Sequence, residues 1–141
     1  MKMSAALSLP QARQATPVVL VVDDEPSICM ALTIALRRAR YEAIAAGSGD
    51  EAEGHLRARR IDGLVLDLRM PDVRGDVLFY SAVALQPHLA RATVFVTGDV
   101  TEKAAQLVEA CACPLVQKPF DLAHVLAAVE KVVQKRRSES A

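Results

Sequence analysis

The stretch VVLVVDDEP, residues 18–26, decides the fold of this chain. It opens with a short, continuous apolar run that is mostly β-branched, which is typical of a strand buried on both faces of a sheet. Two aspartates and a glutamate end the run, and Pro26 follows at a position that suits the first turn of a helix. A buried strand that passes directly into a helix predicts a β-α unit.

The same strand–helix unit recurs along the chain. Apolar runs predict strands at residues 18–22, 41–46, 63–66, 93–96 and 115–116. Apolar residues at helical spacing predict helices at residues 26–40, 50–59, 75–86, 101–110 and 121–134. Strand and helix signals that alternate in this way predict the α/β class, with a parallel sheet covered by helices on both faces.

Length and composition restrict the class of protein. The 141 residues suffice for one domain, which we place at 17–134 between a flexible leader (1–16) and a disordered tail (135–141). Lys plus Arg number 17, as do Asp plus Glu, so charge gives no reason for nonspecific binding to nucleic acid or acidic membrane. With no apolar run near the ~18 residues of a membrane span, we expect a soluble, cytoplasmic protein without nucleic-acid or membrane partners.

The cysteines and histidines do not predict a metal site. The two closest cysteines are separated by one residue, and no second Cys or His pair stands at ligand spacing. We expect the cysteines to act as small buried apolar groups and the histidines to lie on the surface. These residues are Cys29, Cys111, Cys113, His55, His88 and His124.

Polar residues stand where the predicted strands end. Asp23 and Asp24 follow the first strand, Asp67 the third, Thr97 the fourth and Lys118 the fifth. Ligands of such sheets bind beyond the carboxyl ends of the strands, so these residues are expected to meet. Three carboxylates suit Mg²⁺, and a Lys and a Thr beside the metal suit phosphoryl oxygens. The pattern predicts a Mg²⁺-phosphoryl site in which one carboxylate is a nucleophile.

Each of these residues also has an ordinary structural interpretation. The paired aspartates resemble helix caps, Asp67 a strand-ending residue, Thr97-Gly98 a plain turn and Lys118 part of a helix entry. Their joint placement at one edge of one sheet favours the functional interpretation.

Four segments resemble the signature blocks of the response-regulator receiver domain of two-component signalling. They are VVDDEPSI (21–28), LVLDLRMPDVRG (64–75), VFVTGD (94–99) and VQKPF (116–120), and the resemblance runs from about Pro17 to Val133. It implies a flavodoxin-like, doubly wound (βα)5 fold with strand order 2-1-3-4-5. It also implies a phosphorelay domain that receives a phosphoryl group from a histidine kinase or a histidine phosphotransfer protein.

The resemblance implies a role for each site residue. Asp24 would bind Mg²⁺ directly and Asp23 through water, with Asp67 and the backbone carbonyl of Arg69 as further ligands. Such a domain catalyses its own phosphorylation and dephosphorylation and is not an enzyme acting on free substrates.

Asp67 would be the phosphoacceptor, while Thr97 and Lys118 would bind the phosphoryl oxygens. The peptide bond between Lys118 and Pro119 is expected to be cis. A downstream protein would dock on the face formed by residues 101–110, 115–116 and 121–134, and a homodimer is possible. No output domain follows the last predicted helix, so we expect a stand-alone receiver or one cut from a longer protein such as a hybrid histidine kinase.

The chain departs from the family pattern at several positions. Leu115 stands where receivers usually carry an aromatic switch residue, and Gly98 stands where Ala is commoner. Arg69 and Asp99 have opposite charges, and we hypothesise that they pair across the mouth of the site and impede the hydrolytic water. Two alternative functions are a haloacid-dehalogenase-like Mg²⁺ phosphatase, which requires a D-x-D spacing absent from the first loop, and a pseudo-receiver that works without phosphorylation.

Overall fold

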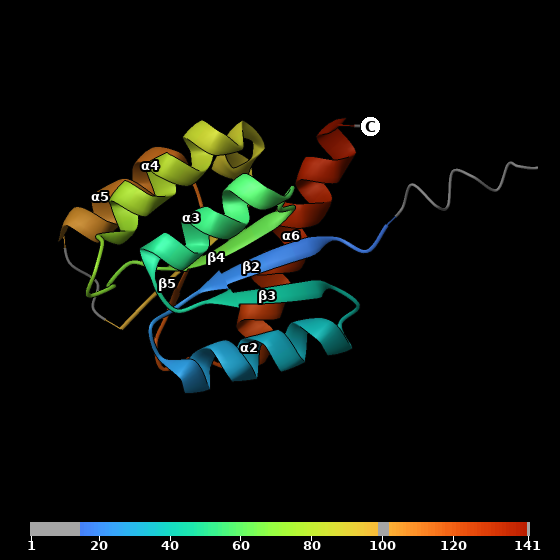
Figure 1. Ribbon diagram of the computed structural model, residues 1–141, viewed down its shortest axis with the longest axis horizontal. Coiled ribbons are helices and arrows are strands. Elements are labelled where there is room, and N and C mark those ends of the chain that lie inside the picture. Colours follow the sequence, from blue (N-terminus) through green and yellow to red (C-terminus); the bar gives the residue numbers. More distant parts are fainter. Residues whose placement is uncertain (1–14, 99–101, 141) are drawn as a thin grey trace, which may run out of the picture.

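The computed structural model describes residues 15–98 and 102–140, and these form a single parallel sheet flanked by helices (Figure 1). The sheet has the order β3-β2-β4-β5-β6, which confirms the predicted order 2-1-3-4-5. Its strands are β2 (Val18–Val22), β3 (Glu42–Ala46), β4 (Gly63–Asp67), β5 (Thr93–Thr97) and β6 (Leu115–Gln117). The helices are α2 (Pro26–Arg38), α3 (Gly49–Ala58), α4 (Gly75–Leu85), η1 (Pro87–Arg91), α5 (Glu102–Cys111) and α6 (Leu122–Ser140).

Alternate residues of each central strand enter opposite cores, as the continuous apolar runs require. On one face of the sheet, Leu20, Leu64 and Phe95 pack with side chains of α3, α4 and α5. On the other face, Val21 and Val65 pack with side chains of α2 and α6. Figure 1 shows these two helical layers on either side of the sheet. The α/β doubly wound class predicted from the sequence is therefore confirmed.

Several element limits differ from the predicted ones. Helix α6 continues to Ser140 instead of ending at Gln134, so the backbone of 135–140, expected as part of a tail, is helical. That segment contains neither Gly nor Pro, so nothing in it stops a helix that is already formed. The short 3₁₀ helix η1 was not predicted. In the described part of the chain, no helix is long and apolar enough to cross a membrane.

The cysteine prediction is confirmed for Cys29 and Cys113, which are buried, while Cys111 is half-buried and all three thiols are free. The surface prediction holds for His124, which is exposed, whereas His55 and His88 are half-buried. His88 belongs to η1, and its Nε2 lies 2.6 Å from the carbonyl oxygen of Ile61. A local helix of this kind leaves little periodic signal in a sequence.

Candidate functional site

The parallel register brings the polar ends of the strands to one edge of the sheet. Val22 is paired with Leu66, Asp67 with Val96, and Thr97 with Gln117. Asp23 therefore follows β2 beside the end of β4, and Lys118 follows β6 beside the end of β5. The carboxylates of Asp23, Asp24 and Asp67 each offer an oxygen within 4.8 Å of the other two. The structure thus brings the three predicted metal ligands together.

Lys118 joins this cluster from the end of β6, which is an outer strand of the sheet. Its Nζ lies 2.8 Å from Asp23 Oδ2 and 3.3 Å from Asp67 Oδ2. Its backbone N–H donates to the carbonyl of Thr97 at 2.7 Å, which fixes the end of β6 against the end of β5. Thr97 itself is fully buried, and the Lys118–Pro119 peptide is cis, as expected.

Local hydrogen bonds hold the two buried carboxylates in place. Asp23 Oδ1 accepts a 2.9 Å bond from the N–H of Glu25, and Asp67 Oδ1 accepts a 3.0 Å bond from the N–H of Arg69. Each is a bond from an aspartate to the residue two positions on, the arrangement of an Asx turn. One oxygen of each carboxylate is therefore used by the backbone, and the second oxygen of each, Oδ2, faces Lys118.

The burial of these groups shifts their proton affinities. Desolvation raises the pKa of the Asp67 carboxyl, and the charge of Asp23 adds to this against the lowering effects of the Arg69 N–H and Lys118. For Lys118, partial burial lowers the pKa, but contacts with Asp23, Glu25 and Asp67 outweigh it and hold the pKa above its usual value. Lys118 is thus a permanent cation between carboxylates.

The acidic cluster fits a hard divalent cation. Asp23 is 1% exposed, and the Lys118 ammonium that lies 2.8 Å from its Oδ2 is shared with Asp67 and Glu25. Several carboxylates that share one cation in a largely buried site carry a costly excess of negative charge, and coordination to a metal ion removes that cost. Asp24 is exposed, and it lines an open pocket together with Asp67, so a metal ion here keeps access to water. This arrangement suits Mg²⁺, which takes one or two carboxylates and keeps several waters. The residues present therefore fit Mg²⁺.

An open pocket of about 330 Å³ lies over the cluster. Its lining is made by residues from four loops, namely Asp24, Glu25, Asp67, Arg69, Gly98 and Lys118. The pocket gives a small anionic group direct access to the Asp67 carboxylate. Gly98 lines this pocket, and a Cβ at that position would stand 3.8 Å from the Lys118 Cβ, an ordinary contact, so the commoner Ala would also fit.

Glu25 is a member of the site that the sequence did not predict. Its Oε1 lies 2.9 Å from Lys118 Nζ, although the two residues are 93 positions apart. In the sequence, Glu25 is only the third acidic residue of the group that ends the first apolar run. Its position directly after the two aspartates was the available signal, but the direction of its side chain depends on where β6 ends.

The loop after Asp67 is held by close backbone contact with α4. A Cβ at Gly75 would stand 2.5 Å from the Leu68 Cα and 2.9 Å from the Asp67 carbonyl oxygen, distances that no real side chain occupies. The N–H of Gly75 also donates to the Leu68 carbonyl. Gly75 is therefore required by the close approach of the helix to the loop.

The same loop is also tied to the neighbouring helix. Asp72 Oδ2 accepts a 2.8 Å bond from the N–H of Gly49 at the start of α3. Two contacts thus fix the segment that follows Asp67.

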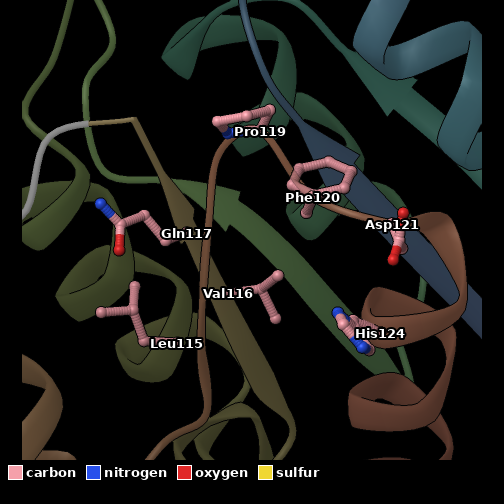
Figure 2. Close-up of a pocket in the computed structure, with 7 residues that line it drawn as sticks. All are labelled: Leu115, Val116, Gln117, Pro119, Phe120, Asp121 and His124. Carbon is pink, nitrogen blue, oxygen red and sulfur yellow. The ribbon is translucent and has the colours of Figure 1, made fainter.

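The structure describes only some of the positions at which the chain departs from the family pattern. Leu115 is half-buried and packs against the core of the α3, α4 and α5 face. It also borders a second pocket, of about 550 Å³, with residues of β6 and the start of α6 (Figure 2). Figure 2 shows Leu115 and Gln117 on one side of the strand and Val116 on the other. Asp99, the expected partner of Arg69, lies outside the described residues.

Comparison with known proteins identifies the family. A family model described as the response regulator receiver domain matches residues 19–130. Protein Rrf1 of Nitratidesulfovibrio vulgaris is 34% identical over 115 residues, which is 82% of this chain and 81% of that protein. The transcriptional regulatory protein PrrA of Mycobacterium tuberculosis is 32% identical over 123 residues, 87% of this chain and 52% of that protein. The chain thus spans about half the length of that relative.

Solved structures agree with this result. A CheY-like receiver domain protein from Methanospirillum hungatei JF-1 shares the fold with a TM-score of 0.82 at 20% identity, covering 89% of this chain and 99% of that one. The chemotaxis protein CheY4 of Vibrio cholerae has a TM-score of 0.75 at 26% identity, covering 84% and 99%. None of these matches supports a phosphatase. The chain belongs to the response regulator receiver domain family.

Proposed function

We propose that this receiver accepts a phosphoryl group on Asp67 from a histidine kinase or a histidine phosphotransfer protein. The observation that carries the proposal is the position of the Asp67 carboxylate. It is buried on its own strand yet lines the open pocket, 3.3 Å from the ammonium of Lys118 and within the acidic cluster. A nucleophilic carboxylate needs this combination of access, a fixed orientation and a neighbouring cation.

The chemical step follows from the positions of these groups. A carboxylate oxygen of Asp67 attacks the phosphorus in line with the leaving nitrogen, so that an O–P bond forms while the P–N bond breaks. The imidazole leaves with the electron pair of that bond and takes up a proton. Lys118 and Thr97 would bind the phosphoryl oxygens and hold the product acyl phosphate, which water later hydrolyses.

The metal would be held by Asp23, Asp24 and Asp67, with the Arg69 carbonyl as a further ligand. When bound, Mg²⁺ neutralises negative charge on the phosphoryl oxygens and on the three carboxylates. The Asx-type bonds to Asp23 and Asp67 keep one oxygen of each carboxylate engaged by the backbone. They therefore leave the second carboxylate oxygen of Asp23 for the metal ion, and that of Asp67 for the metal ion or for attack on phosphorus.

The structural change caused by phosphorylation would alter the face of α5, β6 and α6, where a protein partner docks. Without an aromatic residue at position 115, the change reaches that face through backbone shifts after Thr97. The Arg69–Asp99 pair, a homodimer and a cytoplasmic location remain predictions.

Phosphorylation with a small donor tests the proposal. The purified chain is incubated with Mg²⁺ and phosphoramidate, whose P–N bond breaks as the O–P bond to Asp67 forms and ammonia leaves. We expect one phosphoryl group by intact-mass analysis, removed by hydroxylamine as an acyl phosphate is. Asp67→Asn should remain unlabelled, while Asp50→Asn, an exposed aspartate in the first turn of α3, should label like the parent. Hydroxylamine-sensitive phosphate on the Asp67→Asn protein would refute the assignment.

A further inference from the structure

Lys118 contacts three carboxylates, and they differ in how readily each can release it. The Asp23 and Asp67 side chains are 1% and 4% exposed, whereas the Glu25 side chain is 57% exposed. A buried carboxylate that loses its cation stays uncompensated in a medium of low polarity. Glu25 instead returns to water at little cost. Of the three contacts, the one with Glu25 is therefore the easiest to break.

The chain holds Glu25 in place by its backbone and leaves its carboxylate for Lys118. Glu25 is the N-cap residue directly before α2, with extended backbone dihedral angles, and its side chain makes no capping bond to the helix. Its N–H is used by Asp23 Oδ1 at 2.9 Å, and its Oε1 meets Lys118 Nζ at the same distance. The carboxylate reaches across the mouth of the pocket instead of capping its own helix.

A phosphoryl group must take this place beside Lys118. Glu25 lines the same pocket as Asp67, and its Oε1 occupies a contact position on the ammonium that an incoming phosphoryl oxygen needs. Its negative charge also repels an anionic donor at the pocket mouth. Both effects act before the bond to phosphorus forms, and neither acts on the in-line attack itself.

We propose that Glu25 is a positioning residue that holds Lys118 at the mouth of the pocket and must release it before a phosphoryl donor binds. This inference rests on the proposed function of Asp67. Glu25 then sets how much donor is needed for phosphorylation, and it leaves the rate at saturating donor nearly unchanged.

The test compares Glu25→Gln with the parent protein at a fixed, saturating Mg²⁺ concentration. Initial phosphorylation rates are measured over a range of phosphoramidate concentrations. We expect Glu25→Gln to lower the half-saturating donor concentration by about threefold to tenfold, since one full charge contact is removed. The rate at saturation should stay within about twofold of the parent value, a separation that a general loss of structure would not produce.

Glu51→Gln is the matched control. Glu51 is exposed and borders a neighbouring pocket with Asp23 and Asp24, but its Oε1 accepts a 2.7 Å bond from the N–H of Gly47 and does not contact Lys118. It should leave the half-saturating concentration unchanged, whereas a shift equal to that of Glu25→Gln would overturn the inference in favour of a general charge effect.

The remaining outcomes separate the two proposals. An unchanged or higher half-saturating concentration in Glu25→Gln, with the parent labelled and Asp67→Asn unlabelled, overturns the role of Glu25 alone. Labelling of Asp67→Asn, or no labelling of the parent, overturns the function of Asp67 and the inference with it. Urea unfolding midpoints of all variants confirm that each comparison is made between folded proteins.

Discussion

The two ends of the parallel strands, the amino edge and the carboxyl edge of the sheet, differ in the role of their polar side chains. At the amino ends of the strands, side chains complete the backbone hydrogen bonding. Asp62 accepts a bond from the N–H of Val18, and Gln86 both accepts from the N–H of Ile61 and donates to two carbonyls at the end of α3. At the carboxyl ends, the buried carboxylates of Asp23 and Asp67 face one another across a single ammonium.

This difference separates stability from function within one sheet. Groups whose hydrogen bonds are complete stabilise the fold, whereas buried carboxylates that share one cation reduce the stability of the protein in the absence of a ligand. Changes at the amino edge should therefore affect unfolding without affecting phosphorylation. Changes at the carboxyl edge should affect phosphorylation, with either sign for stability.

The largest effect is expected from Gly75→Ala at the carboxyl edge. The added methyl group overlaps the backbone of the loop after Asp67, which can yield only by moving. We expect a loss of about 3 kcal/mol in the free energy of unfolding, measured with urea, together with slower phosphorylation.

Gly54→Ala is the control for that substitution. Nothing lies within 4 Å of a Cβ at this exposed position inside α3, so Ala should stabilise by about 0.5–1 kcal/mol. Equal effects of the two substitutions would contradict the close approach inferred for Gly75.

A smaller effect is expected from Gln86→Ala at the amino edge. The change removes three hydrogen bonds and leaves the N–H of the buried residue Ile61 without its partner. We expect a loss of about 2 kcal/mol in urea unfolding, with the half-saturating phosphoramidate concentration unchanged. Gln106→Ala, an exposed glutamine on α5, should change neither quantity. A changed phosphorylation rate in Gln86→Ala would show that the two edges are coupled.

Asp67→Asn should stabilise the protein, although it removes the function. Without divalent metal at pH 7, we expect a gain of about 1 kcal/mol, because a buried charge beside Asp23 is removed. The raised pKa of Asp67 sets the pH dependence: the parent gains stability as pH falls through that pKa towards 3.8, whereas the variant has no group to titrate there.

The gap between the two proteins should therefore close on acidification and also on addition of Mg²⁺, which favours the parent. Urea unfolding at several pH values, with EDTA or with Mg²⁺, measures both trends. A gap that widens as pH falls would mean that Asp67 is stabilised as the carboxylate.

The smallest effect is expected from Glu42→Gln, which removes the exposed ion pair with Arg59 at the amino edge. The hydrogen bond from Arg59 lowers the pKa of Glu42, so the stability contribution of this pair is present at neutral pH and is lost as pH falls below about 4.5. Exposed pairs contribute little, so no measurable change in the urea midpoint is expected at pH 7. A clear destabilisation would give this edge an electrostatic role that its hydrogen bonds do not explain.

Much of the fold could be predicted from the sequence because the patterns that specify its strands and helices are local. The apolar runs that become β4 and β5 lie between helical patterns, and the run that becomes β2 precedes the first of them. An alternation of this kind has few solutions other than a doubly wound sheet. The limits of the helices were harder to predict from the sequence, since the end of α6 and the formation of η1 depend on weak local preferences.

The sequence by itself determined which residue types stand at the strand ends, and it thereby predicted Asp23, Asp24, Asp67, Thr97 and Lys118 as one site. It could do so because strands of known direction carry their last residues to a common edge. Only the tertiary structure decided how Asp23 and Asp67 share Lys118 and that Glu25 belongs to the site. Such contacts join residues up to 95 positions apart and depend on side-chain direction, which no local pattern specifies.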